Sequence, residues 1–153
     1  MSRDLVDRFY SSFASQDAEA MVACYGDDVR FEDPAFGELN DGDAGDMWRM
    51  LCANATDLRV DHTVEEASDQ MARTSWTAHY TFSATGRPVR NEVTATMTIR
   101  DGKIVDHRDD FSMWKWSSQA LGMPGKLLGW SPPLAAKVRK MALANLRDFQ
   151  AAQ

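Results

Sequence analysis

Three ionisable side chains stand where they could act together as acids and bases. His107 and Asp109 alternate with Asp106, Arg108 and Asp110 in a segment of strand period, so parity directs both to the covered face. Side chains two residues apart on one strand face are separated by roughly 7 Å at the backbone and can share a hydrogen bond or a water. Ionisable groups on a covered face are costly unless they pair or line a wet pocket. We predict a pocket; the alternative is that Asp109 satisfies a buried group and His107 is a core histidine.

The third candidate is Asp33. It shares a strand face with Phe31 and lies just before Pro34, where the strand must end. Apolar neighbours such as Phe36 and Trp48 would raise its pKa by desolvation, as a general base requires. The alternative is an aspartate that caps the turn before the proline. Of the two aspartates we expect Asp33 to have the higher pKa, because a protonated histidine beside the other would lower its pKa.

A wall of aromatic and apolar residues surrounds these groups in the predicted arrangement. Tyr80 is distinctive, because a buried phenol needs a partner and could donate to a ligand oxygen; Asn91 could do the same. Ordinary core packing is the alternative for the aromatic side chains. The residues expected to act as acids, bases or proton relays are Asp33, Asp109 and His107. Those expected to line the ligand pocket are Phe9, Phe13, Phe31, Trp48, Trp76, Tyr80, Asn91, Met97 and Phe111.

Other chemistries lack their motifs. The chain has no glycine-rich nucleotide fingerprint, no G-x-S-x-G elbow and no H-E-x-x-H pair. Its three histidines are far apart, and His79 falls by parity on the strand face opposite Tyr80. The two cysteines, Cys24 and Cys52, form neither a disulfide framework nor a ligand pattern. We therefore expect no metal and no cofactor.

Composition limits the partners. The chain has 153 residues, 44% of them hydrophobic and 26% charged, which is typical of one globular domain. Its formal net charge of −6 disfavours a nucleic-acid backbone as partner. The N-terminus is charged from the third residue, and no apolar stretch approaches a membrane span. We expect a cytoplasmic protein that contacts neither nucleic acid nor membrane.

The spacing of apolar residues predicts mainly helices in the N-terminal part of the chain and strands in the part that follows. Helical spacing covers residues 5–13, 18–25 and about 44–55, with a short strand at 29–33 and a loop at 35–43. Period-two patterns follow at residues 58–64, 76–82, 91–99 and 105–111. Four antiparallel strands with one apolar face need helices to cover it, so the fold class is α+β. The main domain should span residues 1–114. A C-terminal extension, residues 115–153, should pack on it, with loops at 123–125 and 131–133 and a last helix from Pro133 to about Phe149.

The short sequence motifs and the order of the predicted elements resemble those of the nuclear transport factor 2-like superfamily. Within it, they resemble the SnoaL-like family, which is related to polyketide cyclases and ketosteroid isomerases. Three stretches carry the resemblance: residues 15–21 together with 25–34, residues 100–105, and residues 107–111. The resemblance covers about residues 3–114. It implies a cone, in which a curved antiparallel sheet wraps around the helices and leaves a pocket at the open end.

The resemblance also implies roles for single residues. Asp33 matches the position of the ketosteroid isomerase general base, and Asp109 matches the strand aspartate that activates water in the epoxide hydrolases. Phe9 and Ala95 stand where the isomerases hold their oxyanion donors. The hypothesis is a cofactor-independent isomerase, cyclase or hydrolase that acts on a small apolar molecule with a carbonyl or epoxide group. The alternative is a non-catalytic ligand-binding or homodimerisation module with a vestigial pocket.

Self-association is the second partner that the pattern suggests. One face of the predicted sheet is rich in threonine, which is polar enough to be exposed and flat enough to pair. We expect a homodimer through this face, which carries Thr77, His79, Thr81, Thr94, Thr96 and Thr98.

Overall fold

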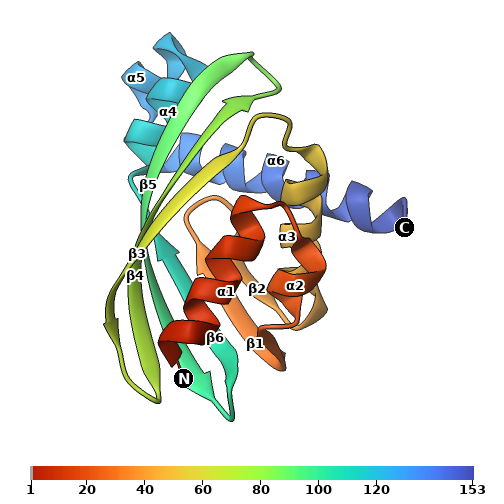
Figure 1. Cartoon of the computed structure of the whole chain (residues 1–153). Helices are drawn as coiled ribbons and strands as arrows, with labels where there is room; N and C mark the ends of the chain where they lie inside the picture. The colour runs from red at the N-terminus through yellow and green to blue at the C-terminus, as the bar shows by residue number, and fades with distance from the viewer. Residues whose placement is uncertain (1) are drawn as a thin grey trace.

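A six-stranded sheet curves around three N-terminal helices in the computed structural model, which describes residues 2–153 (Figure 1). The strand order is β2–β1–β6–β5–β4–β3. The helices are α1 (Ser2–Ala14), α2 (Ala18–Val22), α3 (Gly42–Asn54), α4 (Met113–Leu121), α5 (Met123–Leu128) and α6 (Pro132–Ala151). The strands are β1 (Tyr25–Asp33), β2 (Gly37–Asn40), β3 (Arg59–Ala67), β4 (Met71–Phe82), β5 (Arg87–Arg100) and β6 (Lys103–Asp110). The predicted α+β class, with a curved sheet around helices, is confirmed.

Alternation along β5 shows how the sequence builds the concave face. Every second side chain is buried: Val89, then Val93, Ala95, Met97 and Ile99. The residues between them, including Thr94, Thr96 and Thr98, are exposed on the outer face. One face therefore packs against α1 and α3, and the other carries the threonine-rich surface.

Two features of the first strands differ from the prediction. The pairing of β1 with β6 is parallel, so the prediction of a wholly antiparallel sheet is wrong at this one pair. The meander ends beside β1 with its last strand running in the same direction. The predicted loop at 35–43 contains β2, because Gly37 turns the chain at φ +72° and lets β2 pair back onto β1.

A β-bulge in β6 decides which of its side chains face inward. Thr98 pairs with Asp106 but Ile99 pairs with Ile104, so Val105 is an extra residue. The bulge reverses parity, and Ile104 and His107 are both buried although three positions separate them. Simple two-residue alternation back from His107 would place Val105 on the inner face as well, but Val105 is only half-buried, because the bulge interrupts the alternation.

The C-terminal segment packs on the far end of the sheet and across the helices. α4 lies against β5, where the Arg90 amide donates to the Gln119 side-chain oxygen at 2.7 Å (Figure 1). α6 contacts α3 and buries Leu146 in the main core. The loop predicted at residues 123–125 is instead α5, because Pro124 sits in its first turn, where a proline is tolerated. Within residues 2–153, none of these helices combines the length and apolarity needed to cross a bilayer.

Candidate active site

A cavity of about 1010 Å³ lies between the concave face of the sheet, α3 and the C-terminal helices. It is lined by eight of the residues that the sequence assigned to the site: Asp33, Asp109, Phe13, Trp48, Trp76, Tyr80, Asn91 and Phe111. The C-terminal segment supplies another part of the wall, including Trp116, Leu121, Leu134, Val138 and Phe149. This volume is at the upper end of the range for small-molecule sites, and most of the wall is apolar.

Four predicted site residues lie beneath the cavity instead of lining it. Phe9, Phe31, Met97 and His107 are almost completely buried, and none of them belongs to the wall. Strand parity placed Phe31, Met97 and His107 on the correct face, and helical spacing did the same for Phe9, but neither pattern could tell the cavity floor from the layer below it. For Phe9, Phe31 and Met97 the expectation of a place in the pocket wall is wrong; they are core residues that support it. His107 is different, because it touches a wall residue through a hydrogen bond.

A chain of hydrogen bonds runs through the core to Asp109. The Trp48 indole nitrogen donates to the Tyr25 hydroxyl oxygen at 2.8 Å. The same hydroxyl lies 2.8 Å from Nδ1 of His107, whose Nε2 lies 2.8 Å from Oδ1 of Asp109. The Trp76 indole nitrogen donates to that same Oδ1 at 3.3 Å. Both bonds to Asp109 end on Oδ1, so neither of them occupies Oδ2.

The donor at one end of this chain fixes the direction of the first bond. Trp48 can only donate, so the Tyr25 oxygen accepts from it. The Tyr25 hydroxyl keeps one hydrogen and a second lone pair, so either it or Nδ1 of His107 can be the donor in the next bond. A carboxylate only accepts, so Nε2–H of His107 is the donor to an ionised Asp109. The bonds from His107 and Trp76 together hold the Asp109 carboxyl in one orientation.

Aromatic rings enclose His107. Its ring stacks on Trp48 at 6.0 Å between centroids, and Phe31 and Phe9 meet it edge-on at 5.0 and 5.5 Å. His107 is fully buried, so the imidazole cannot exchange directly with solvent. Its only polar contacts within residues 2–153 are Tyr25 and Asp109.

Asp33 is held in a different way. Its Oδ1 accepts from the backbone amides of Ala35 and Phe36 at 2.9 and 2.6 Å, which is the turn-capping role that the sequence left open. It also lines the cavity, so the turn cap and a position at the pocket are compatible. Parallel pairing of Phe31 with His107 brings Asp33 to the level of Asp109 on the neighbouring strand.

Burial raises the pKa of Asp33 to about 7. The two backbone N–H donors act in the opposite direction, and the nearby charge of Asp109 raises the pKa further. Desolvation is the largest of these effects, since apolar side chains surround the carboxyl on the protein side. A carboxyl with a pKa near 7 can both accept and donate a proton at neutral pH.

Tyr80 is prepared to donate to a ligand. Its oxygen accepts from the Trp116 indole at 2.8 Å, so its own hydroxyl hydrogen remains for another acceptor. Burial raises its pKa, which keeps the phenol protonated. Tyr80 and Asn91 line the same cavity as the two aspartates. The cavity thus combines a proton acceptor, a group that exchanges protons at neutral pH and a neutral O–H donor.

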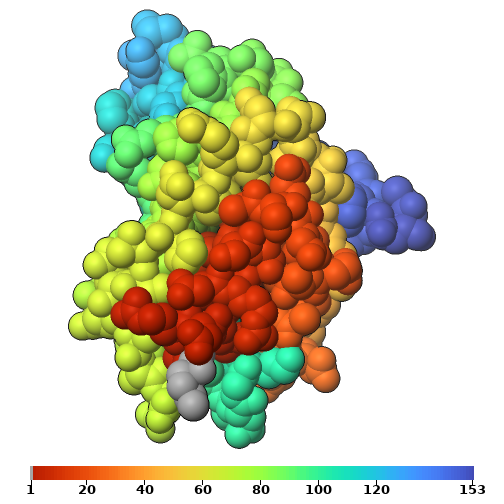
Figure 2. Space-filling view, in the orientation of Figure 1, coloured from red at the N-terminus to blue at the C-terminus, as the bar shows by residue number. Residues whose placement is uncertain are grey.

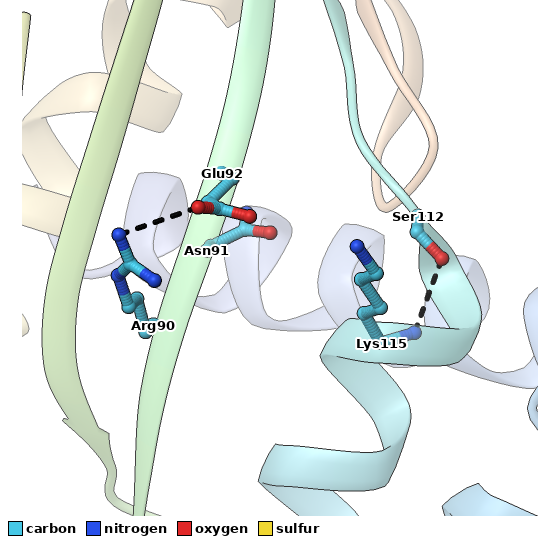
Figure 3. A pocket seen from close by; sticks show the side chains of 5 residues that line it. All are labelled: Arg90, Asn91, Glu92, Ser112 and Lys115. Atoms are coloured by element: carbon cyan, nitrogen blue, oxygen red, sulfur yellow. Dashed lines mark hydrogen bonds and ion pairs between the residues drawn. The ribbon is translucent and has the colours of Figure 1, made fainter.

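A second, much smaller hollow lies where α4 begins. It measures about 120 Å³ and is lined by Arg90, Asn91, Glu92, Ser112 and Lys115 (Figure 3). Arg90 pairs with Glu92 at 3.3 Å, and the Ser112 hydroxyl caps α4 by accepting from the Lys115 amide. Its polar groups bind one another and its volume is small, so we assign the site to the large cavity.

Metal-binding and thiol chemistry find little support in the described part of the chain. Across residues 2–153, no three His, Cys, Asp or Glu side chains converge as a metal site would require. Cys24 and Cys52 are buried free thiols, and burial raises the pKa of both.

Three features of the site escaped the sequence-based prediction. Tyr25 was assigned to a helix, yet it begins β1 and joins Trp48 to His107. Trp116 and the wall residues of α6 lie in the segment that was treated as an extension. A buried tyrosine between helix and strand signals could have identified Tyr25, because its hydroxyl requires a partner.

The fold and the site together are those of an α+β cone with two carboxyl groups at an apolar cavity. The chain matches the family model of the SnoaL-like domain over residues 6–107, and it belongs to that family. The predicted resemblance is confirmed. No curated protein matches the chain by sequence.

Solved structures with this fold differ in the function attributed to them. A protein of Catenulispora acidiphila with a ketosteroid isomerase-like fold, solved in complex with trimethylamine, is similar at TM-score 0.69 and 15% identity; the match covers 86% of this chain and 100% of that one. A putative polyketide cyclase of Silicibacter sp. is similar at TM-score 0.68 and 17% identity, with 77% and 93% covered. An LEH-like epoxide hydrolase of M. tuberculosis is similar at TM-score 0.59 and 19% identity, with 88% of this chain and 93% of that one covered. At these identities the likeness shows the fold.

Proposed function

We propose that this protein is a cofactor-independent enzyme that moves a proton on a small, mostly apolar molecule carrying a carbonyl or epoxide oxygen. The observation that carries the proposal is the hydrogen-bonded chain from Trp48 to Asp109, which ends at the wall of the large cavity. A cavity with a purely structural role does not require a buried histidine that is hydrogen-bonded to an aspartate of its wall. The three neighbouring structures bear names of isomerase-like, cyclase and epoxide hydrolase type, which agrees with this reaction class.

The geometry suggests how the work is divided. The Tyr80 hydroxyl donates to the substrate oxygen and stabilises the negative charge that develops there. Asp109 takes a proton from the carbon next to a carbonyl, or from a water that attacks an epoxide. His107 holds Asp109 in place and acts as a positioning residue, since it does not reach the cavity. Asp33, with its pKa near 7, returns a proton to the product.

Hydrogen–deuterium exchange tests this function without knowledge of the natural substrate. A panel of cyclic ketones is incubated with the protein in D₂O, and loss of the proton next to the carbonyl is followed by NMR. We expect catalysed exchange for at least one bulky apolar ketone. A matched panel of cyclic epoxides, followed by diol formation, tests the hydrolase version of the same site.

Two variants make the test specific. Asp109→Asn should abolish the catalysed exchange, whereas Asp110→Asn, one residue further and exposed on the outer face, should leave it intact. Exchange that is equal in both variants would overturn the assignment of Asp109. Tight binding of the panel with no exchange and no hydration would instead favour the non-catalytic binding module.

The homodimer remains part of the proposal. Thr94, Thr96 and Thr98 lie exposed on the outer face of β5, as the expected interface requires. Light scattering should give a particle of twice the 17.1 kDa chain mass, and Thr96→Arg should shift it toward the monomer. A wild-type protein that stays at 17.1 kDa at micromolar concentration would refute the dimer.

A further inference from the structure

Large apolar side chains lie exposed on one part of the C-terminal segment. Five of them lie within residues 114–130, and we call these five side chains the apolar patch. Its members are Trp114 (47% exposed), Met123 (63%), Leu127 (63%), Leu128 (53%) and Trp130 (72%). A concentration of exposed apolar residues on a globular protein marks an interaction surface. In Figure 2 the segment that carries the patch projects at the upper end of the molecule, in light blue.

The apolar patch is contiguous and firmly built. The Trp114 indole donates to the Lys126 carbonyl at 3.1 Å, and the Trp130 indole donates to the Leu127 carbonyl at 2.9 Å. Both tryptophans are thus tied to α5. Their N–H groups are already satisfied, so the rings can enter an apolar environment without an unpaired donor. α5 is itself fixed on α4, because Gly125 lies so close to the Ser117 carbonyl that a Cβ would overlap it.

Charge is distributed unevenly along the chain. Residues 113–153 contain six basic side chains and one acidic side chain, Asp148, for a net charge of +5. Residues 1–112 contain eleven basic and 22 acidic side chains, for a net charge of −11. Lys126 lies within the apolar patch, and Lys115 follows Trp114 directly. The stretch that exposes the apolar side chains, residues 114–130, therefore carries two lysines and no acidic residue.

We propose that the apolar patch docks on an anionic lipid surface. Exposed tryptophan and leucine beside lysine is the composition of interfacial segments, in which rings and aliphatic chains enter the headgroup layer and ammonium groups remain at the phosphates. The expectation of no membrane contact was based on the absence of a spanning segment, and a peripheral contact needs none. Association of two patches from two copies is disfavoured, because it would bring together two stretches that each carry two lysines and no acidic residue.

The proposal connects the docked surface with the cavity, although it does not depend on the proposed function. Leu121 and Pro124 line the cavity, and both lie in the chain between Trp114 and Leu127. Docking would therefore bring one wall of the cavity to the lipid surface. An apolar ligand dissolved in the membrane would have a short route to the site.

Co-sedimentation of the full chain with vesicles tests the docking. Vesicles of phosphatidylcholine with about 30% phosphatidylglycerol should bind the wild-type protein at about 0.1 M salt, and binding should weaken as salt rises. Vesicles of phosphatidylcholine alone should bind it several-fold less. The double variant Leu127→Gln/Trp130→Gln should lose roughly tenfold or more in partitioning, because it removes two inserting side chains. Both residues are exposed, and an unchanged melting temperature shows that the variant folds.

A charge-matched pair provides the control. Lys126→Glu reverses a charge inside the apolar patch and should reduce binding to anionic vesicles several-fold. Arg73→Glu makes the same change at an exposed position of β4, near the opposite end of the sheet, and should not (Figure 1). Failure of the wild type to bind the anionic vesicles would overturn the proposal, as would equal losses in the two charge variants. A protein dimer that Leu127→Gln/Trp130→Gln dissociates, without vesicle binding, would assign the patch to self-association and overturn it as well.

Discussion

The cavity contains two aspartates, and their carboxyl groups accept hydrogen bonds from different kinds of donor. Asp109 lies within β6 and accepts from two side-chain N–H groups, those of His107 and Trp76. Asp33 lies at the end of β1 and accepts from two backbone amides of the following turn. Adjacent strands bring them to the same level of one cavity. Environment, rather than residue type, therefore decides what each can do.

The difference shows how one cavity can hold two carboxyl groups with different properties. Side chains that extend through the core to Tyr25 and Trp48 hold Asp109 in a fixed orientation. Asp33 is held only locally, and burial raises its pKa to about 7. A fixed acceptor beside a group that exchanges protons near neutral pH is the arrangement expected for acid–base catalysis. Removing either kind of support should change one aspartate more than the other.

The largest effect is expected from truncating Asp109. Asp109→Ala would leave the buried N–H groups of His107 and Trp76 without an acceptor, and it should destabilise the fold by about 2–4 kcal/mol. Asp110→Ala, on the exposed neighbour, should change the free energy of unfolding by less than about 0.5 kcal/mol. Chemical denaturation of both variants measures the difference. Similar stabilities would mean that the chain of hydrogen bonds does not depend on Asp109.

A smaller loss of stability is expected from a change further along the chain of hydrogen bonds, at Tyr25. Tyr25→Phe removes the hydroxyl between Trp48 and His107, leaves both nitrogens unpaired and should cost about 1–3 kcal/mol. Tyr10→Phe is the matched control, because the Tyr10 hydroxyl is also buried and has no hydrogen-bond partner within residues 2–153. That control should be neutral or slightly stabilising. A Tyr10→Phe loss as large as that of Tyr25→Phe would contradict the special role of Tyr25.

Replacing Asp33 should stabilise the protein at high pH, whereas the two preceding substitutions should destabilise it. Its folded-state pKa of about 7 lies above the unfolded value of about 3.9, so its neutral form is the one that the fold prefers. The stability that it contributes is present below pH 4 and is lost as pH rises through 7. Asp33→Asn keeps an acceptor for the two turn amides and should stabilise the protein at pH 8 by about 1–3 kcal/mol. At pH 4 the two proteins should have nearly equal stability. Thermal melts across this range would contradict the prediction if the variant gained nothing at pH 8.

Much of the fold was predictable, because the spacing of apolar residues and the residues of tight turns are strong local signals. The alternation along β5 and the Asp101-Gly102 turn define a hairpin with one inward face, which matches the structure. The same parity argument correctly placed His107 and Asp109 on the covered face. It failed at Val105, because a bulge arises from pairing with a neighbouring strand and leaves no mark in a two-residue period.

The site was less predictable, because depth and long-range contact are not properties of a single segment. Phe31 and Asp33 share a face, yet the first lies below the cavity floor and the second lines it. Tyr25 and His107 are 82 residues apart, and only the parallel pairing of β1 with β6 brings them together. Trp116 could not be linked to Tyr80 while its segment was regarded as lying outside the domain core.

The most direct test of the central claim is a titration of the Asp33 carboxyl carbon by NMR, assigned by its disappearance in Asp33→Asn. A cavity that desolvates this carboxyl predicts a midpoint near pH 7, about three units above an ordinary aspartate. Filling the cavity with a bulky apolar ketone should move the midpoint higher, because the ligand displaces water from around the carboxyl. A midpoint near 3.9 that a ligand does not move would contradict the claim, since Asp33 would then be a solvated turn residue without a role in proton transfer.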